Sequence, residues 1–354
     1  MKNINRFNWL VVCMPILILA TYPVYKDGAF AFALLSTILT GLVQIVFSIM
    51  LLIDEPKNKF LQLYVVGVLF YFLSIYFVGS SIEDKQLVFI FYFVFAYILA
   101  IYLSLIINFK HKANNSFLTA EWNDLAIVNF EIDAAILSKY VPIGTEIDFW
   151  NGKCFISLIG FMFEDVRVLG LKIPFHTDFE EVNLRFYVKR FEDGIWKRGV
   201  VFIKEIVPKH AITIVANTLY KEHYETLKMR HQRTQTSVQK SFRYEWLKGK
   251  KWYSMSMSTA AEQQEIAINS EAEFITEHYF GYTKFNKKTT IEYEVTHPRW
   301  QQLQVMDYEI DVNFEHIYGK DFTFLNDLRP TSAFLAIGSK ITIEGKKTIK
   351  QSIK

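Results

Sequence analysis

The chain has 354 residues, of which 51% are hydrophobic and 21% are charged, and its formal net charge is +3. Residues 1–112 hold eight Lys and Arg and five Asp and Glu, so the whole excess lies there and the remainder is neutral. Nucleic-acid-binding domains usually carry a basic excess of their own, so this sequence disfavours a nucleic-acid partner. Cys13 and Cys154 lie far apart in different environments and indicate neither a disulfide framework nor a CxxC pair.

Four apolar runs without any Asp, Glu, Lys, Arg or His fill the first third of the chain. Each can hold the roughly 20 residues that a helix needs to cross a bilayer. We therefore predict a four-span membrane domain over residues 1–112, with spans near residues 7–25, 29–53, 60–79 and 87–108.

The first run allows a second interpretation, because it follows Lys2 and Arg6 and contains Pro15 and Pro23. A basic start before a short apolar segment is also typical of a cleaved signal peptide. The absence of ionisable residues from all four runs favours an anchor over a transport path. A short apolar pore, or a lipid or quinone pocket between the helices, stays open.

Basic residues in the short loops predict the orientation. Lys57 and Lys59 lie in the second loop and Lys110 and Lys112 follow the fourth run, whereas the first and third loops each hold one lysine beside acidic residues. Lys and Arg are retained on the cytoplasmic side of membranes. We expect a multi-pass protein of the cytoplasmic membrane, with both termini and the soluble part in the cytosol.

After a linker at residues 113–117, the pattern changes to alternation with period two, which is typical of half-buried strands. We predict a mainly β domain with a few helices over residues 118–345 and a tail over 346–354. Asn151-Gly152 and Asp193-Gly194 are turn pairs that favour antiparallel hairpins. The strand candidates span residues 126–132, 154–163, 181–190, 199–206, 289–295 and 303–310.

Two polar clusters interrupt this alternation. Glu181, Asn183, Arg185 and Tyr187 share one face of a predicted strand, which is either a ligand-binding interior or a solvated outer face. Lys204 and Glu205 must point to opposite faces of the next strand, so at most one of them faces the interior. Pro208 ends that strand and presents Lys209 and His210 together.

A capping-box pattern, Ser270 followed by Glu273, predicts a helix over residues 272–278 that ends at His278 and Tyr279. His176, His231 and His297 form no HxxxH or HExxH pair with each other or with His278, so we expect no metal site. The sequence also lacks a Gly-rich dinucleotide motif, a Walker loop and a Gly-x-Ser-x-Gly elbow, and we expect no cofactor.

Several ordered segments carry a family resemblance that spans the soluble domain and none of the membrane block. They include Leu137-Ser-Lys-Tyr-Val-Pro-Ile-Gly-Thr-Glu146, Pro174-Phe-His-Thr-Asp-Phe-Glu-Glu-Val-Asn-Leu-Arg-Phe-Tyr-Val188 and Arg198-Gly-Val-Val-Phe-Ile-Lys-Glu-Ile-Val-Pro208. Here the chain resembles the uncharacterised YqjF-like family (domain of unknown function 2071) of the acetoacetate decarboxylase-like superfamily. The resemblance implies a closed or nearly closed β-barrel around a small-molecule cavity.

The same resemblance bears on catalysis. Acetoacetate decarboxylases form a Schiff base through a lysine that follows a proline and precedes a second lysine, and Lys209 stands in the similar place. His210 replaces the second lysine, and a neutral imidazole lowers an amine pKa much less than a cation does. Lys209, with His210 beside it, is therefore the candidate for a decarboxylase or related lyase.

Our leading hypothesis is a membrane-anchored, cytosolic β-barrel that binds a small acidic or carbonyl-containing molecule. The predicted ligand-binding residues are Glu181, Arg185, Tyr187, Glu205, His231, His278 and Tyr279. The first alternative is the lyase that uses Lys209. The second is a regulatory or interaction module for a partner membrane protein, and a homo-oligomer is also left open.

Overall fold

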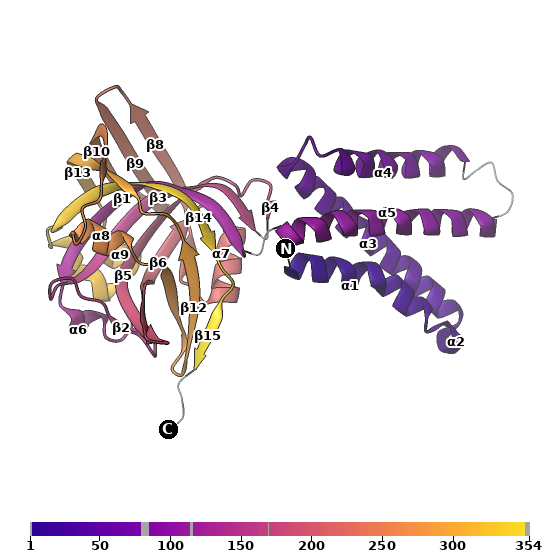
Figure 1. The fold of residues 1–354 in the computed structure, drawn as a ribbon, viewed down its shortest axis with the longest axis horizontal. Coiled ribbons are helices and arrows are strands. Elements are labelled where there is room, and N and C mark those ends of the chain that lie inside the picture. The colour runs from indigo at the N-terminus through magenta and orange to yellow at the C-terminus, as the bar shows by residue number, and fades with distance from the viewer. Residues whose placement is uncertain (1, 79–84, 114–115, 169, 351–354) are drawn as a thin grey trace. The chain divides into compact units, whose positions relative to one another are not determined.

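The computed structural model describes residues 2–78, 85–113, 116–168 and 170–350, which form two compact units (Figure 1). The helical unit comprises Met1–Leu118 together with Arg167–Phe175, and the β unit comprises Thr119–Val166 and His176–Lys354. The predicted end of the third span at Gly79, residues 114–115 of the predicted linker and residues 351–354 of the tail lie outside the described residues.

Five helices make up most of the helical unit: α1 (Lys2–Leu19), α2 (Tyr22–Tyr25), α3 (Asp27–Asp54), α4 (Lys59–Val78) and α5 (Lys85–Ala113). Three of their described stretches are long and apolar enough to cross a membrane, namely Ala31–Ile53, Lys59–Tyr76 and Phe91–Asn108. These stretches agree with the second, third and fourth predicted spans.

The prediction that residues 7–25 form the first of four spans is wrong. This run is split into α1, whose described apolar part is the shorter stretch Asn5–Leu19, and the single turn α2. Pro23 lies at the start of α2, where its missing N–H costs nothing, but it cannot continue a helix from α1. The chain therefore turns after Leu19, and the apolar helix before the turn is too short to count as a span.

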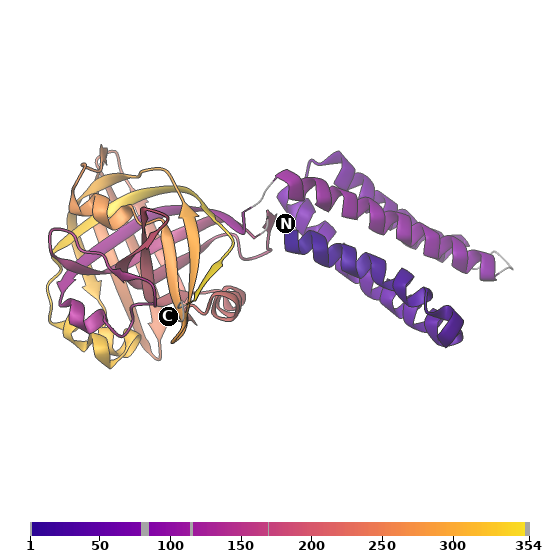
Figure 2. The same cartoon turned by 60° about the horizontal axis from the view of Figure 1, so that its bottom comes forward.

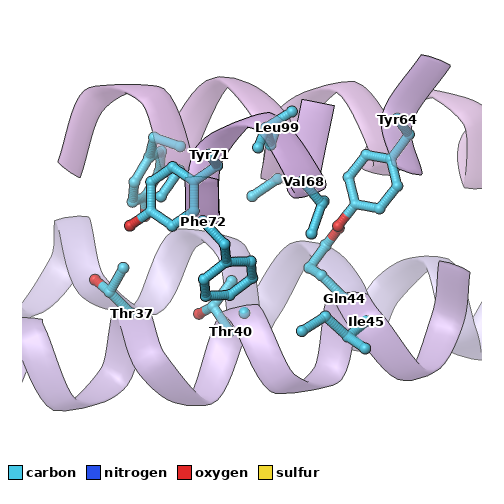
Figure 3. A pocket seen from close by; sticks show the side chains of 13 residues that line it. Thr37, Thr40, Gln44, Ile45, Tyr64, Val68, Tyr71, Phe72 and Leu99 are labelled. Carbon is cyan, nitrogen blue, oxygen red and sulfur yellow. The ribbon is translucent and has the colours of Figure 1, made fainter. Parts of the chain in front are cut away.

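Uncharged polar side chains tie α1 to its neighbours. Gln44 Nε2 donates to Asn8 Oδ1 (2.6 Å), and Asn8 Nδ2 donates to Ser104 Oγ (2.8 Å). Asn8, Gln44 and Ser104 are at most 2% exposed. A cavity of about 80 Å³ lies beside Gln44 among α3, α4 and α5, and Figure 3 shows Tyr64 and Tyr71 at its edge.

The β unit is built on one continuous sheet in the order β15-β12-β11-β6-β5-β3-β1-β14-β13-β10-β9-β8. Strand β12 also pairs with β14, so the seven strands from β12 to β14 form a closed circuit of pairings. In Figure 2 the strands curve around a common interior. Strand β6 pairs in parallel with β7 and β11, whereas the other pairings of defined register are antiparallel.

The strands of the sheet include the predicted segments, which lie within β1, β3, β5, β6, β12 and β13. Their bounds are β1 (Leu118–Ile132), β2 (Glu146–Ile147), β3 (Cys154–Val168), β4 (Leu171–Lys172), β5 (Phe179–Glu192), β6 (Ile195–Val207), β7 (Tyr224–Thr226), β8 (Lys228–Gln235), β9 (Gln239–Lys248) and β10 (Lys251–Glu265). The last are β11 (Phe280–Asn286), β12 (Thr289–Thr296), β13 (Gln301–Asp311), β14 (Ser332–Ile343) and β15 (Lys347–Lys350). Strand β15 lies within the predicted tail and pairs with β12.

Short helices connect the strands: α6 (Ala134–Leu137), α7 (His210–Val215), the π-helical turn η1 (Ala216–Tyr220), α8 (Glu271–Thr276), α9 (Phe314–Tyr318) and the 3₁₀ helix η2 (Lys320–Asn326). Asp133 caps α6 and Ser270 caps α8 through their side chains, and the Ser270 cap was predicted. Helix α8 ends at Thr276, so His278 lies in the connection to β11 and not inside the helix. Asp193 and Gly194 both have positive φ, which confirms the hairpin turn between β5 and β6.

The alternation of β5 separates the core from a polar interior. Val182, Leu184 and Phe186 are fully buried in the main hydrophobic cluster. Glu181, Asn183 and Arg185 lie on the other face and are also buried, at 2%, 2% and 8% exposure. The alternative of a solvated outer face is therefore wrong, because this polar face is enclosed.

Candidate functional site

A cavity of about 60 Å³ lies against the polar face of β5. Its wall is mostly apolar, with a few polar side chains from separate strands and from the connection before β11. The residues that line it are Trp122, Leu125, Ile159, Phe161, Phe163, Glu181, Asn183, Arg185, Val200, Phe202, Glu205, Tyr224, His278, Phe280, Gly281, Tyr293, Val295 and Ile343. An apolar wall with few converging polar groups is the usual form of a small-molecule site.

Strand pairing brings the acidic residues of the cavity together. Asn183 of β5 lies opposite Glu205 of β6 in the antiparallel register, and Asn183 Nδ2 donates to Glu181 Oε1 (2.9 Å). The Tyr224 hydroxyl donates to Glu181 Oε2 (3.1 Å). Lys204, the neighbour of Glu205, bonds instead to Glu225 (2.9 Å), which confirms that these two residues point to opposite faces.

Burial changes the protonation of this acidic cluster. It raises the pKa of Glu181 to about 7, an effect that hydrogen bonds from Asn183 and Tyr224 only partly oppose. Burial also raises the pKa of Glu222 to about 7, although Thr283 Oγ1 donates to Glu222 Oε1 (2.5 Å). The pKa of Glu205 is raised well above its usual value by burial and by the charges of Glu222 and Glu181. Near neutral pH the cluster therefore holds protons that ordinary glutamates have lost.

Arg185 brings a positive charge to the same cavity without an ionic partner. Its Nη2 donates to the Ile275 carbonyl at 3.4 Å, a long bond, and its Nε has no hydrogen-bond partner. Within the described parts of the chain, no carboxylate oxygen lies within 4.0 Å of its guanidinium nitrogens. A buried charge of this kind is costly unless an opposite charge compensates it.

His278 forms a pair with Asp148 at the edge of the cavity. Its Nε2 lies 3.2 Å from Asp148 Oδ2, and Arg198 Nε donates to the same oxygen at 2.7 Å. Burial raises the pKa of Asp148, but hydrogen bonds from His278 and Arg198 outweigh it and hold the pKa at about 2. Burial lowers the pKa of His278 to about 4, and the bond to Asp148 opposes this only in part. At neutral pH Asp148 is thus ionised and His278 is neutral.

Buried polar atoms without partners are concentrated on the cavity wall. Among the described residues, five buried atoms of the cavity lining have no hydrogen-bond partner: Trp122 Nε1, Asn183 Oδ1, Arg185 Nε, Glu205 Oε2 and His278 Nδ1. Folded proteins pair nearly all buried polar groups, and exceptions often mark functional sites. The cavity therefore offers both donors and acceptors to a ligand.

The structure brings four of the predicted ligand-binding residues to this cavity, namely Glu181, Arg185, Glu205 and His278. Tyr187 lies directly behind it, because its ring packs on the His278 ring at 4.8 Å between centroids and its hydroxyl lies 2.7 Å from Ser157 Oγ. Its role is to support the wall.

The other predicted residues lie outside the lining. His231 is on β8, where its Nδ1 is 2.6 Å from Glu180 Oε1, and the Tyr279 hydroxyl donates to Glu277 (2.6 Å). Lys209 precedes α7 and is partly exposed, and His210 is exposed at the first position of that helix. No lysine lines the cavity. Within the described residues, no group of three or more His, Cys, Asp or Glu side chains is arranged to hold a metal ion.

Sequence reasoning missed several residues of the site. Asn183 was placed on the correct face but was not assigned to ligand binding. Asp148, Glu222 and Tyr224 come from short connections and a three-residue strand, which carry no periodic pattern. Their proximity to β5 depends on long-range pairing, such as that of β7 with β6.

The fold and the cavity together define a mainly β domain with an enclosed pocket, whose apolar wall carries a few buried polar groups. Residues 119–340 match the family model DUF2071, described as "Uncharacterized conserved protein", and the chain belongs to this family. It is also similar to "Uncharacterized protein YqjF" of Bacillus subtilis (strain 168), with 27% identity over 197 residues, 54% of this chain and 77% of that protein. The predicted YqjF-like family is confirmed.

Solved structures with a similar fold include an acetoacetate decarboxylase from Legionella pneumophila, with a TM-score of 0.46 and 11% identity over 68% of this chain and 91% of that chain. An acetoacetate decarboxylase-like enzyme from Sphingomonas wittichii RW1 has a TM-score of 0.44 and 11% identity, over 67% of this chain and 94% of that chain.

Proposed function

We propose that the DUF2071 domain of this chain binds a small carboxylate in the cavity beside β5, and that Arg185 receives the anion. The observation that carries this proposal is the buried guanidinium of Arg185, which has no ion pair and an unpartnered Nε. A bound carboxylate supplies the missing negative charge and forms charge-assisted hydrogen bonds with the planar guanidinium.

The acidic cluster is compatible with an anionic ligand because its raised pKa values reduce its negative charge near neutral pH. A protonated glutamate donates a hydrogen bond, so Glu205 is suited to a carbonyl or carboxylate oxygen. The small volume, about 60 Å³, limits the ligand to a few carbon atoms unless the wall moves. In this proposal the circuit of strands from β12 to β14 acts as a barrel that encloses the ligand.

Isothermal titration of the detergent-solubilised full chain tests the proposal with acetate, lactate and pyruvate, and with acetamide as the neutral counterpart of acetate. We expect carboxylates to bind, acetamide not to bind, and Arg185→Gln to weaken carboxylate binding by about 10- to 100-fold. Arg185→Lys keeps the positive charge but lacks the planar set of N–H donors, so it should weaken carboxylate binding less than Arg185→Gln does.

Arg299→Gln is the matched control, because Arg299 pairs with Glu273 on the exposed side of the unit. Its affinity for carboxylates should equal that of the wild type. Equal binding of acetate and acetamide, or carboxylate binding that survives Arg185→Gln, would contradict the proposal.

We also propose that the three long apolar helices anchor the chain in the cytoplasmic membrane with the β unit in the cytosol. Lys57 and Lys59 precede one candidate span and Lys110 and Lys112 follow another, so the positive-inside rule favours this side. A reporter fused after residue 354 should be active only in the cytosol. Reporter activity on the outer side of the membrane would contradict this orientation.

The lyase that uses Lys209 and the interaction module stay predictions. The apolar cavity wall holds no lysine, so no observation favours a Schiff base over simple binding.

A further inference from the structure

His278 offers the cavity a hydrogen-bond acceptor, and Asp148 determines which of the two ring nitrogens this is. The ionised Asp148 can only accept, so the His278 nitrogen that faces it, Nε2, must carry the proton. Lys189 Nζ lies 3.7 Å from Asp148 Oδ1, and Arg198 donates to Oδ2, so two cations keep this carboxylate charged. In the neutral ring, Nδ1 then carries a lone pair and no proton.

The unpartnered Nδ1 is held in a fixed position. The His278 side chain is 1% exposed, and its ring packs against Phe274 (5.0 Å between centroids) and Tyr187 (4.8 Å). Among the residues that the structure describes, none donates a hydrogen bond to Nδ1. A buried acceptor in a locked ring selects for a ligand that brings a donor.

Arg185 lies against the same aromatic ring. Its guanidinium carbon is 5.7 Å from the centroid of Tyr187, and Arg185 and His278 both line the cavity. The Arg185 Nε–H donor and the His278 Nδ1 acceptor, which have no partner among the described residues, thus belong to two side chains that both lie against Tyr187. A ligand that satisfies both must combine an anion with a neighbouring hydrogen-bond donor.

We propose that the ligand is a small 2-hydroxycarboxylate, whose carboxylate binds Arg185 and whose hydroxyl donates to His278 Nδ1. This inference rests on the proposed carboxylate function and deepens it. The corresponding 2-oxo acid has only acceptors next to its carboxylate, so it leaves Nδ1 buried without a partner. Such a mismatch in a site built for hydrogen bonds gives strong discrimination.

Titration with lactate and pyruvate, which share three carbon atoms and one carboxylate, tests the inference. We expect the wild-type full chain to prefer lactate by about tenfold or more. His278→Phe keeps a planar ring but removes the acceptor, so the preference should disappear while pyruvate still binds. His231→Phe is the matched control, because His231 bonds to Glu180 outside the cavity lining, and it should keep the full preference.

Asp148→Asn provides a second variant with a different signature. An amide at this position can donate to Nε2 and favour the tautomer with a proton on Nδ1. The preference for lactate over pyruvate should then be smaller than in the wild type or turn toward pyruvate. A merely structural role of Asp148 would not produce this change.

The outcomes separate this inference from the function on which it rests. If no carboxylate binds, both fail. If carboxylates bind through Arg185 but lactate and pyruvate bind equally, or if His278→Phe keeps the wild-type preference, the hydroxycarboxylate inference fails alone.

Discussion

The two units bury polar groups of different kinds. The described buried polar side chains of α1, α3 and α5 are uncharged, and Asn8, Gln44 and Ser104 bond to each other across helices. The β unit instead buries ionisable groups such as Glu181, Arg185 and His278. Both units leave some buried polar atoms of the described residues without a partner, but in the β unit several of these atoms belong to ionisable groups. Polar groups bonded to each other hold helices together, whereas unpaired ionisable groups can bind or react.

The two cavities repeat this contrast. The larger one, in the helical unit, is lined by apolar side chains with Thr37, Thr40, Gln44 and tyrosines (Figure 3). It contains no Asp, Glu, Lys, Arg or His. The cavity of the β unit is lined by four such residues, namely Glu181, Arg185, Glu205 and His278. The charge of the wall therefore distinguishes these two cavities.

A pair of glycine substitutions should give the largest difference between the units. A Cβ on Gly338 would lie 1.8 Å from the Trp122 carbonyl oxygen at a φ of +88°. Gly338→Ala should destabilise the β unit by about 3 kcal/mol or more, because backbone cannot move aside. A Cβ on Gly67 of α4 meets only the end of the Leu99 side chain at 2.8 Å, so Gly67→Ala should change stability by less than about 1 kcal/mol.

Thermal unfolding of the full chain measures both variants, with tryptophan fluorescence as the signal for Gly338→Ala and the helical circular dichroism signal for Gly67→Ala. Six of the seven tryptophans lie in the β unit, so the fluorescence reports mainly on that unit. A Gly338→Ala variant as stable as the wild type would show that the backbone of β14 beside Trp122 is free to rearrange.

The pH dependence of stability tests the buried acids. The pKa of Glu181 rises from 4.5 to about 7 on folding. Between these pH values the carboxyl of Glu181 loses its proton in the unfolded chain but keeps it in the folded chain. The contribution of Glu181 to folding stability is therefore complete below pH 4.5 and is lost as the pH rises through 7. Over this pH range the free energy of unfolding of the wild type should fall by a few kcal/mol more than that of Glu181→Gln.

Denaturant unfolding of both proteins from pH 4.5 to 8 measures this difference, in which contributions from histidines cancel. Glu262→Gln, on the exposed part of β10, is the control. If wild type and Glu181→Gln change in parallel, Glu181 is already ionised in the folded chain, and the contrast in buried charge between the units becomes weaker.

A smaller effect is expected in the helical unit. Asn8→Leu removes the bonds to Gln44 and Ser104 and should cost about 1–2 kcal/mol. Thr37→Val is the control, because the Thr37 hydroxyl bonds only to the Ala33 carbonyl of its own helix. A double-mutant cycle of Asn8→Leu with Ser104→Ala in detergent isolates the coupling. A coupling energy of zero would mean that α1 is held by apolar packing alone.

The smallest effect is expected at Lys209. Because this side chain lies outside the cavity lining, Lys209→Ala should leave carboxylate affinity unchanged. Borohydride treatment with pyruvate, followed by mass spectrometry, should give no adduct at Lys209. A wild-type adduct that disappears in Lys209→Ala would instead support the lyase alternative and move the reactive centre to the start of α7.

Much of the β unit was predictable because its signals are local. Period-two alternation located the strands around Glu181 and Glu205, and turn chemistry located the hairpin at Asp193-Gly194. Alternation also placed Glu181, Asn183 and Arg185 on one face. It could not say whether that face is enclosed, because closure depends on the pairing of β12 with β14 far along the chain.

The remaining parts of the site depend on contacts that no local pattern records. His278 and Asp148 are 130 positions apart, and the bond between them fixes the His278 tautomer. In the helical unit, composition made residues 7–25 look like one span because hydropathy counts apolar residues and ignores the backbone donor that Pro23 lacks.

The division of the chain into units has a practical meaning for anyone who wishes to separate them. Because Arg167–Phe175 belongs to the helical unit, the chain passes between the units three times, after Leu118, after Val166 and after Phe175. Leu171 of this segment is fully buried with Leu51, Leu61, Tyr64, Leu103 and Ile107. Deleting the helices alone would leave Leu171 without the side chains against which it packs.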